Sequence, residues 1–181
     1  GFAEGIYEDA EAVRLFADSG MTFFVSSSFS KSFSLYGERV GALSIVTESK
    51  DQASRVLSQL KRVIRTNYSN PPTHGATVVG HVLNTPELNA LWQAELGEMR
   101  ERILLMRKLL VEQLAAKGAK RDFSFVAAQR GMFSYSGLTT EQVDRLRNEF
   151  AIYAVGTGRI CVAALNMNNI DTVTDAIVQV F

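Results

Sequence analysis

The chain has 181 residues, which is enough for one domain of ordinary size or for one domain with part of another. Its 46% apolar and 21% charged residues match the composition of soluble globular proteins and argue against intrinsic disorder. Basic and acidic side chains are equal in number, 19 of each, which removes any overall electrostatic reason to bind nucleic acid or an anionic membrane.

The first half of the sequence alternates helical and strand patterns. Apolar residues recur at helical spacing over residues 9–17 and again over 51–65. Between these helices, residues 21–25 and 40–46 form two apolar runs with the composition of buried parallel strands. A proline-containing break and a further helix over residues 73–83 follow. This order of elements predicts an α/β fold.

A single long helix is predicted in the middle of the chain. It begins with Thr85 as N-cap and Pro86 at the first helical position, and it ends at Gly118. Its length of roughly 30 residues corresponds to about 45 Å. Because a helix of this length outruns a single core, we expect it to bridge two lobes. We expect one domain over residues 1–97 and a second over residues 98–181.

The second half of the sequence has short elements that predict a small α+β lobe. We expect strands over residues 123–126, 132–136, 153–155 and 159–163, and helices over residues 139–150 and 171–180. Cys161, the only cysteine, lies between Ile160 and Val162, so we expect a buried strand residue and no internal disulfide.

Several further patterns concern the cellular context. The single cysteine fits a reducing compartment, no signal-peptide pattern opens the sequence, and no apolar run approaches the roughly 18 residues of a membrane span. We therefore expect a cytoplasmic protein with no nucleic-acid or membrane partner. His74 and His81 have no carboxylate or cysteine support, so we expect no metal site.

A cluster of hydroxyl groups and two cations surrounds Lys31. This lysine follows the first predicted strand, and ligands of open α/β sheets bind beyond the ends of strands. Serine hydroxyls, Lys31 and Arg39 together suit a phosphate monoester, and a lysine amine can bind a carbonyl compound covalently. A solvated lysine in an ordinary serine-rich loop is the alternative, and the composition alone leaves it open.

Four segments, in this order along the chain, resemble motifs of one family: residues 28–41, 65–72, 130–134 and 158–163. The family is that of the aspartate/aromatic amino acid aminotransferases, which have fold type I and depend on pyridoxal 5'-phosphate. The resemblance covers essentially the whole chain, and the stretch SFSKSFSLYGERVG is more similar to the aromatic branch. It implies the C-terminal part of the family's large domain, a long connecting helix and most of the small α+β domain.

The resemblance implies roles for three residues around the cofactor. Lys31 would hold the cofactor covalently and then move a proton at the substrate Cα as a general acid/base. Ser28 and Arg39 match positions that bind the cofactor phosphate, where a hydroxyl and a guanidinium fork suit a dianion. The alternative for Arg39 is an ion pair with Glu38.

The resemblance also implies substrate-binding residues. Arg159 matches the arginine that grips the substrate α-carboxylate, and the alternative is a surface arginine on a strand. Arg65 matches an arginine that reaches into the partner subunit's site, and its alternative is a cation favoured by the helix dipole. Asn70 lies in the same cross-subunit segment. Phe133 matches an aromatic residue beside the substrate, and core packing is its alternative.

The implied activity is transamination of aromatic, and also dicarboxylic, L-amino acids with 2-oxoglutarate in a homodimer. The family's other cofactor-binding residues lie upstream of the lysine, whereas only 30 residues precede Lys31. The chain is therefore similar to the C-terminal half of such an enzyme, and we expect it to need the upstream half and to be inactive alone. A non-catalytic pyridoxal-phosphate or phosphate-binding module and an inert structural fragment are the alternatives.

Overall fold

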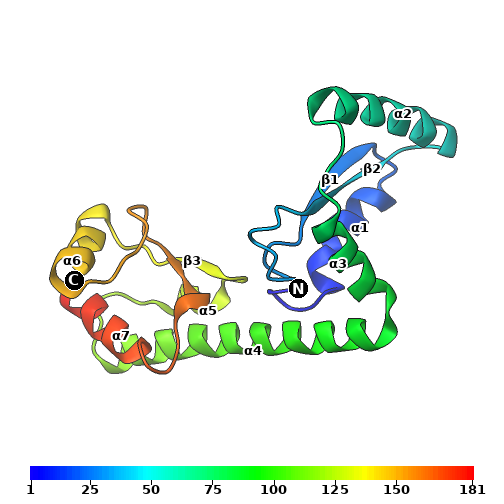
Figure 1. The fold of residues 1–181 in the computed structure, drawn as a ribbon. Helices are drawn as coiled ribbons and strands as arrows, with labels where there is room; N and C mark the ends of the chain where they lie inside the picture. Colours follow the sequence, from blue (N-terminus) through cyan, green and yellow to red (C-terminus); the bar gives the residue numbers. More distant parts are fainter. The chain divides into compact units, whose positions relative to one another are not determined.

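The computed structural model describes all residues from 1 to 181. The chain divides into two compact units: the first holds Gly1 and Ile6–Leu96, and the second holds Phe2–Gly5 and Gly97–Phe181. Helix α4 (Pro86–Ala116; labelled in Figure 1) contributes residues to both units. None of the helices combines the length and the apolar character needed to cross a bilayer.

The first unit consists of helices and one two-stranded sheet (Figure 1). Before the start of α4 its elements are η1 (Glu8–Ala10), α1 (Glu11–Asp18), β1 (Phe23–Ser28), β2 (Gly41–Val46), α2 (Lys50–Asn67) and α3 (His74–Asn84). All of its predicted helices are confirmed to within a few residues. Ser49 caps α2 by accepting a hydrogen bond from the backbone N–H of Gln52, 3.2 Å away.

The expectation of buried parallel strands in this unit is wrong. Strands β1 and β2 pair antiparallel, with Phe23 opposite Val46 and Ser28 opposite Gly41. The connection between them holds no helix that could carry the chain back along the sheet, so the second strand returns beside the first. Each strand has a single neighbour, and the side chain of Phe24 is 67% exposed. An apolar run reports β propensity but not the direction of its partner.

The second unit contains most of the hydrophobic core. Besides its part of α4, it holds α5 (Ser124–Ala128), β3 (Phe133–Tyr135), α6 (Thr140–Phe150), β4 (Arg159–Cys161), η2 (Val162–Ala164) and α7 (Ile170–Gln179). The buried apolar side chains of α4, α6 and α7 pack in one cluster that includes Ile103, Leu110, Leu146, Ile170 and Ile177. Strands β3 and β4 pair antiparallel, with Tyr135 opposite Arg159.

Two strands predicted in this unit are absent. Residues 124–128 form helix α5 because the carboxylate of Asp122 accepts hydrogen bonds from the backbone N–H of Ser124 (2.8 Å) and from its hydroxyl (2.7 Å), which fixes the first turn. Residues 153–155 are irregular, and a turn follows in which Gly158 N–H donates to the Val155 carbonyl at 2.8 Å. The strand predicted over 159–163 ends at Cys161, whose side chain is half-buried rather than buried.

The ends of α4 and α6 agree with the sequence signals. Helix α4 begins at Pro86, and Gly118, with φ +75°, takes the left-handed conformation just after the helix ends. The hydroxyl of Thr139 and the side chain of Gln142 form a capping box at the start of α6.

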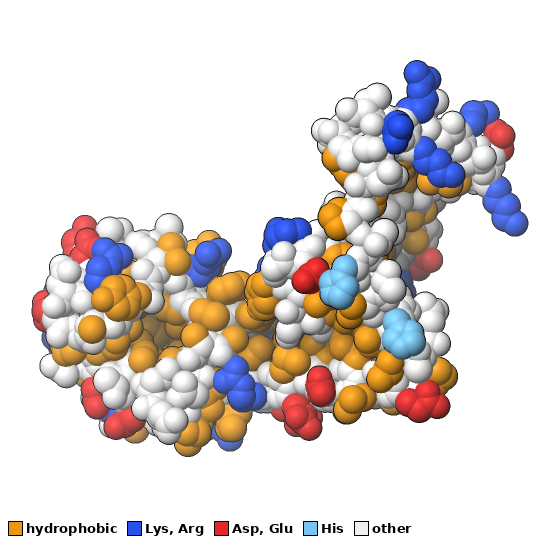
Figure 2. Space-filling model, in the orientation of Figure 1, with side chains coloured by type: hydrophobic (Ala, Val, Ile, Leu, Met, Phe, Trp, Pro, Cys, Tyr) orange, Lys and Arg blue, Asp and Glu red, His pale blue; other side chains and the backbone are white.

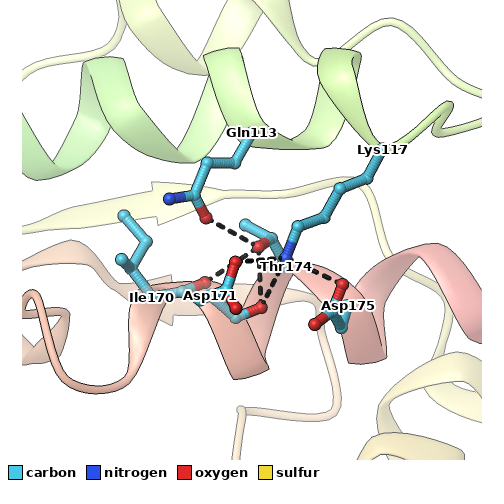
Figure 3. A network of polar contacts seen from close by, with 6 residues as sticks. All are labelled: Gln113, Lys117, Ile170, Asp171, Thr174 and Asp175. Atoms are coloured by element: carbon cyan, nitrogen blue, oxygen red, sulfur yellow. Dashed lines mark hydrogen bonds and ion pairs between the residues drawn. The ribbon is translucent and has the colours of Figure 1, made fainter.

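A polar network joins the end of α4 to α7 (Figure 3). The Lys117 Nζ lies 2.7 Å from a carboxylate oxygen of Asp171 and 2.7 Å from one of Asp175. Beside it, the hydroxyl of Thr174 donates to Oε1 of Gln113 at 2.9 Å. Desolvation alone would lower the pKa of Lys117, but the hydrogen bonds and charges of the two aspartates outweigh it and raise that pKa. The network therefore fixes the last helix of the chain to the long helix.

Candidate active site

Lys31 lies in the loop that follows β1, as predicted, and its side chain is exposed. The loop is anchored to α4, because the ring of Phe33 stacks on Trp92 with 4.7 Å between ring centroids. The Trp92 indole N–H also donates to the carbonyl oxygen of Ser32 at 2.6 Å. The Lys31 Nζ lies 5.8 Å from the ring centroid of Tyr36. The loop therefore holds the amine in solvent, near the ring of Tyr36.

Ser28 and Arg39 lie at the same end of the β1–β2 ribbon as Lys31. Ser28 is the last residue of β1 and pairs with Gly41, and Arg39 precedes that glycine by two residues. The backbone of Arg39 has φ +52°, a left-handed conformation that costs a non-glycine residue free energy. Its guanidinium donates to the carbonyl oxygen of Tyr36 at 2.9 Å. No ion pair with Glu38 forms, so that alternative for Arg39 is not found.

The donors at this end of the ribbon suit an anion that also carries a carbonyl group. The hydroxyl of Ser28 lies 3.2 Å from that of the buried Ser30, and it accepts the backbone N–H of Ser30 at 3.3 Å. Hydroxyls, one guanidinium and one primary amine all belong to this end of the ribbon, where the Arg39 guanidinium donates to the Tyr36 carbonyl and the Lys31 amine lies near the Tyr36 ring. This donor set fits a phosphate ester held by hydroxyl and guanidinium, with the amine free to react with an aldehyde.

Arg65 and Asn70 lie together where α2 passes into α3. Arg65 is in the last turn of α2, and its guanidinium donates to the hydroxyl of Ser69 at 2.8 Å. Ser69 itself has φ +69°, and the backbone N–H of Asn70 donates to the Tyr68 carbonyl at 2.9 Å. Lysine and arginine side chains gather over α2 in Figure 2. Its cations are Lys50, Arg55, Lys61, Arg62 and Arg65. The alternative of a helix-terminal cation therefore stays open for Arg65.

Arg159 and Phe133 lie together on the β3–β4 ribbon of the second unit. The Arg159 guanidinium carbon lies 5.1 Å from the centroid of the Phe133 ring, within cation–π range. Phe133 is 44% exposed, so core packing is not its role. The preceding Gly158 has φ +80°, and a Cβ there would lie 2.5 Å from the Leu138 carbonyl oxygen. The hydroxyl of the buried Ser136 donates to the Gly158 carbonyl at 2.7 Å, which fixes the backbone next to Arg159.

The candidate residues thus form three local groups. One is Ser28, Lys31 and Arg39, a second is Arg65 and Asn70, and both belong to the first unit, whereas Phe133 and Arg159 belong to the second. No cluster of three or more His, Cys, Asp or Glu side chains that could hold a metal ion occurs in the chain.

Comparison with known families matches residues 1–177 to the model described as aminotransferase class I and II. The chain belongs to this aminotransferase family. The match covers nearly all of the chain and includes all three groups of candidate residues. The resemblance inferred from the four motifs is confirmed.

Relatives of this aminotransferase chain carry more than one substrate name. It is 77% identical over 180 residues to the aspartate aminotransferase of Pseudomonas aeruginosa, covering 99% of the chain and 45% of the relative. It is 53% identical over 180 residues to the aromatic-amino-acid aminotransferase of Escherichia coli, again covering 99% of the chain and 45% of the relative. The chain therefore spans less than half the length of these curated relatives, and their names do not separate the aspartate from the aromatic branch.

Solved aminotransferase structures share the fold. The crystal structure of the aromatic-amino-acid aminotransferase of Burkholderia pseudomallei, covalently bound to pyridoxal phosphate, matches with a TM-score of 0.97 and 72% identity. The match covers 99% of this chain and 45% of that one. A mitochondrial aspartate aminotransferase from Trypanosoma brucei matches with a TM-score of 0.96 and 46% identity, covering 99% of this chain and 48% of that one. The fold-type I class expected from the sequence is confirmed.

One notable residue of this aminotransferase chain was missed in the sequence. Arg107 on α4 is 1% exposed and donates hydrogen bonds into the segment that precedes and forms β3. The available signal was its position: Arg107 lies four residues after Ile103 and three before Leu110, on the apolar face of α4. A charged residue at a core position indicates a buried polar contact.

Proposed function

We propose that this chain carries the lysine and the anion-binding residues of a pyridoxal 5'-phosphate-dependent transaminase. The proposed substrates are aromatic and dicarboxylic L-amino acids, with 2-oxoglutarate as the acceptor. The observation that carries the proposal is the position of Ser28, Lys31 and Arg39 at one end of the β1–β2 ribbon. The family match and the pyridoxal phosphate in the Burkholderia pseudomallei relative support it.

Lys31 is the proposed catalytic residue. Its exposed amine would hold the cofactor by condensing with the cofactor's aldehyde with loss of water and, once freed by the substrate, would take the proton from the substrate Cα. Bound pyridoxal phosphate supplies a sink for the electron pair that remains on Cα. The anchor of Phe33 on Trp92 keeps the amine in position between the two tasks.

Ser28 and Arg39 are the proposed phosphate-binding residues. The Ser28 hydroxyl donates to a phosphate oxygen, and the remaining guanidinium N–H groups of Arg39 donate in a planar fork. The left-handed backbone of Arg39 supports a binding role, because strained conformations of this kind concentrate at ligand sites.

Arg159 is the proposed binding residue for the substrate α-carboxylate. Its guanidinium is exposed, makes no ion pair, and faces the ring of Phe133, so the fork is available for a bidentate contact while the ring limits its motion. The ring of Phe133 also offers an apolar surface to the substrate side chain.

Arg65 and Asn70 are the proposed contribution to a second subunit's site. In a homodimer, the α2–α3 connection would reach the partner's substrate, where Arg65 would bind a side-chain carboxylate or move aside for an aromatic ring. The exposure of both residues and the strained backbone of Ser69 between them support a binding role.

We further propose that the 181 residues alone do not turn over substrate. The chain spans 45% of its curated relatives, and the family's cofactor-binding residues upstream of the lysine are not among the residues described above. The absence of a carboxylate opposite the pyridine nitrogen would weaken the electron sink. A kinetic assay of the purified chain with an aromatic amino acid and 2-oxoglutarate tests this, and turnover at the rate of a complete enzyme would refute it.

The covalent role of Lys31 is tested by adding pyridoxal phosphate to the purified chain, reducing with borohydride and mapping the modified lysine by mass spectrometry. We expect one adduct, at Lys31, and none in Lys31→Arg, which keeps the charge but cannot form the bond. The alternatives predict different results. A non-catalytic binding module that retains Lys31, Ser28 and Arg39 would give the same adduct without turnover even when the upstream half is supplied, and an inert fragment would give scattered adducts or none.

A further inference from the structure

The β3 strand of the second unit rests on a buried arginine that has no carboxylate partner. The Arg107 Nη1 donates to the Val126 carbonyl at 3.0 Å and also to the hydroxyl of Ser134. Its Nη2 donates to the carbonyl of Gly131 at 2.7 Å and to that of Phe133 at 3.2 Å. The remaining nitrogen, Nε, is buried and has no hydrogen-bond partner. The guanidinium thus binds three carbonyls and one hydroxyl of a single short segment.

Such an arrangement is costly for stability alone. Burial lowers the pKa of Arg107, and the positive charge of Arg130 lowers it further. Apolar residues of similar volume often replace buried charges without loss of stability. The contacts of Arg107 therefore indicate that it serves to hold the backbone of this segment in place. The planar guanidinium can bind several of its acceptors at once, which a lysine ammonium group on a flexible stem does less well.

The segment that Arg107 holds is the one that presents Phe133. Ser134 is buried on the inner side of β3, where Arg107 binds it, and the neighbouring Phe133 is exposed on the other side. On that outer side the Phe133 ring faces the guanidinium of Arg159. A shift of the β3 backbone at Ser134 would therefore change the position of the Phe133 ring relative to the Arg159 guanidinium.

We infer that Arg107 is a positioning residue for Phe133 and, through that ring, for the carboxylate-binding Arg159. Its fork fixes the backbone of residues 131–134, which sets the ring of Phe133 and, through it, the orientation of the Arg159 guanidinium. The ligand whose binding depends on it is a carboxylate of an amino acid or a 2-oxo acid. In that last respect the inference rests on the proposed function.

The test is Arg107→Lys in the whole 181-residue chain, which keeps the charge and the aliphatic stem and removes the fork. Nuclear magnetic resonance gives two readouts. The first is the nuclear Overhauser effect between Phe133 ring protons and Arg159 side-chain protons. The second is the affinity for 2-oxoglutarate, followed at the Arg159 Nε–H. We expect the first signal to be lost and the affinity to fall roughly tenfold or more, as for a displaced charge-assisted contact.

Lys117→Met is the control, because it breaks a second polar network just beyond the end of the same helix without touching β3. General destabilisation would affect both variants, whereas loss of positioning affects Arg107→Lys alone. Ser134→Ala, which removes one acceptor of the fork, serves if Arg107→Lys does not fold, and it should weaken the same signal.

The two readouts separate the inference from the proposed function. An unchanged Phe133–Arg159 signal in folded Arg107→Lys and Ser134→Ala overturns the positioning role. If the unaltered chain shows that signal but binds no 2-oxoglutarate, the carboxylate role of Arg159 fails, and the signal in the variants still decides the positioning role.

Discussion

A guanidinium and an ammonium group should behave differently at position 159. Arg159→Lys keeps the charge but loses the fork, so we expect the affinity for 2-oxoglutarate to fall by about 1.5–3 kcal/mol, the value of a hydrogen bond to a charged group. Isothermal titration calorimetry measures it. Arg147→Lys, which alters an exposed ion pair with Asp144, is the control and should bind unchanged. Equal affinity of Arg159→Lys would contradict the assigned role.

Gly158 should be less replaceable than other glycines with a left-handed backbone. Gly158→Ala adds a Cβ that would lie 2.5 Å from a carbonyl oxygen, whereas at Gly118, which also has positive φ, no atom lies within 4 Å. We expect Gly118→Ala to cost about 1 kcal/mol from backbone strain alone. Gly158→Ala should cost about 1–3 kcal/mol more. Urea unfolding of both variants measures the difference, and equal losses would show that the Leu138 contact relaxes freely.

The sequence could nominate candidate side chains but could not predict how the fold holds them. The resemblance identified Lys31, Ser28 and Arg39, whereas the left-handed backbone of Arg39 depends on a loop that only the folded ribbon determines. Arg107 was missed for a different reason. A charged side chain usually indicates a solvated face, and the acceptors that bury it lie 19 to 27 residues away.

The short helix α5 depends on the ionised carboxylate of Asp122. The backbone N–H of Ser124 and, next, its hydroxyl lower the pKa of Asp122. The pKa of Asp122 is lower in the folded than in the unfolded chain. Its contribution to the free energy of unfolding is therefore present above the unfolded pKa and is lost as pH falls through the folded pKa. In Ser124→Ala we expect the pKa of Asp122 to rise part of the way to its ordinary value, measured by carboxyl NMR titration. Ser19→Ala is the control and should leave the pKa of Asp122 unchanged, because the Ser19 hydroxyl contacts only the backbone of Phe16 and Met21.

The stabilisation that Lys117 provides between α4 and α7 should be lost in alkaline solution. The pKa of Lys117 is raised in the folded chain, so its contribution to the free energy of unfolding is fully present below the unfolded pKa. It is lost as pH rises through the folded pKa. Lys117→Met should therefore lower the Tm at neutral pH and should have little effect above the raised pKa. Calorimetry at both conditions measures this. Lys108→Met, on the same helix and 3.7 Å from Glu112, should change the Tm little at either pH.

Elements with strong end signals could be predicted, and elements defined by their partners could not. Helix α4 has Pro86 at its start, a glycine beyond its end and a sustained apolar spacing between them. Residues 123–126 alternate like a strand, yet Phe123 and Val126 are also spaced three apart, and both are buried in the core. The hydrogen bonds from Ser124 to the Asp122 carboxylate favour the helical turn. The antiparallel partner of β1 likewise depends on the path of a connection that carries no periodic signal.

At the scale of the whole molecule, the core is unevenly divided between the units. In the first unit only Val79 and Leu96 are buried among the large apolar side chains, whereas the second unit holds a continuous cluster. We expect amides of β1 and β2 to exchange with solvent about 100-fold faster than those of α6 and α7, because few buried contacts protect them. Hydrogen exchange with mass spectrometry tests this, and equal protection of the two sets would contradict it.

The closing helix α7 has a consequence for synthesis on the ribosome. Its residues Ile170, Ala176 and Ile177 complete the cluster that begins on α4 with Ile103, more than 60 positions earlier in the chain. A nascent chain can form α4 early, but it cannot complete the burial of the apolar face of that helix until α7 emerges. Translation therefore passes through an interval in which this face is available to chaperones, and premature termination before Ile170 yields a polypeptide suited to degradation.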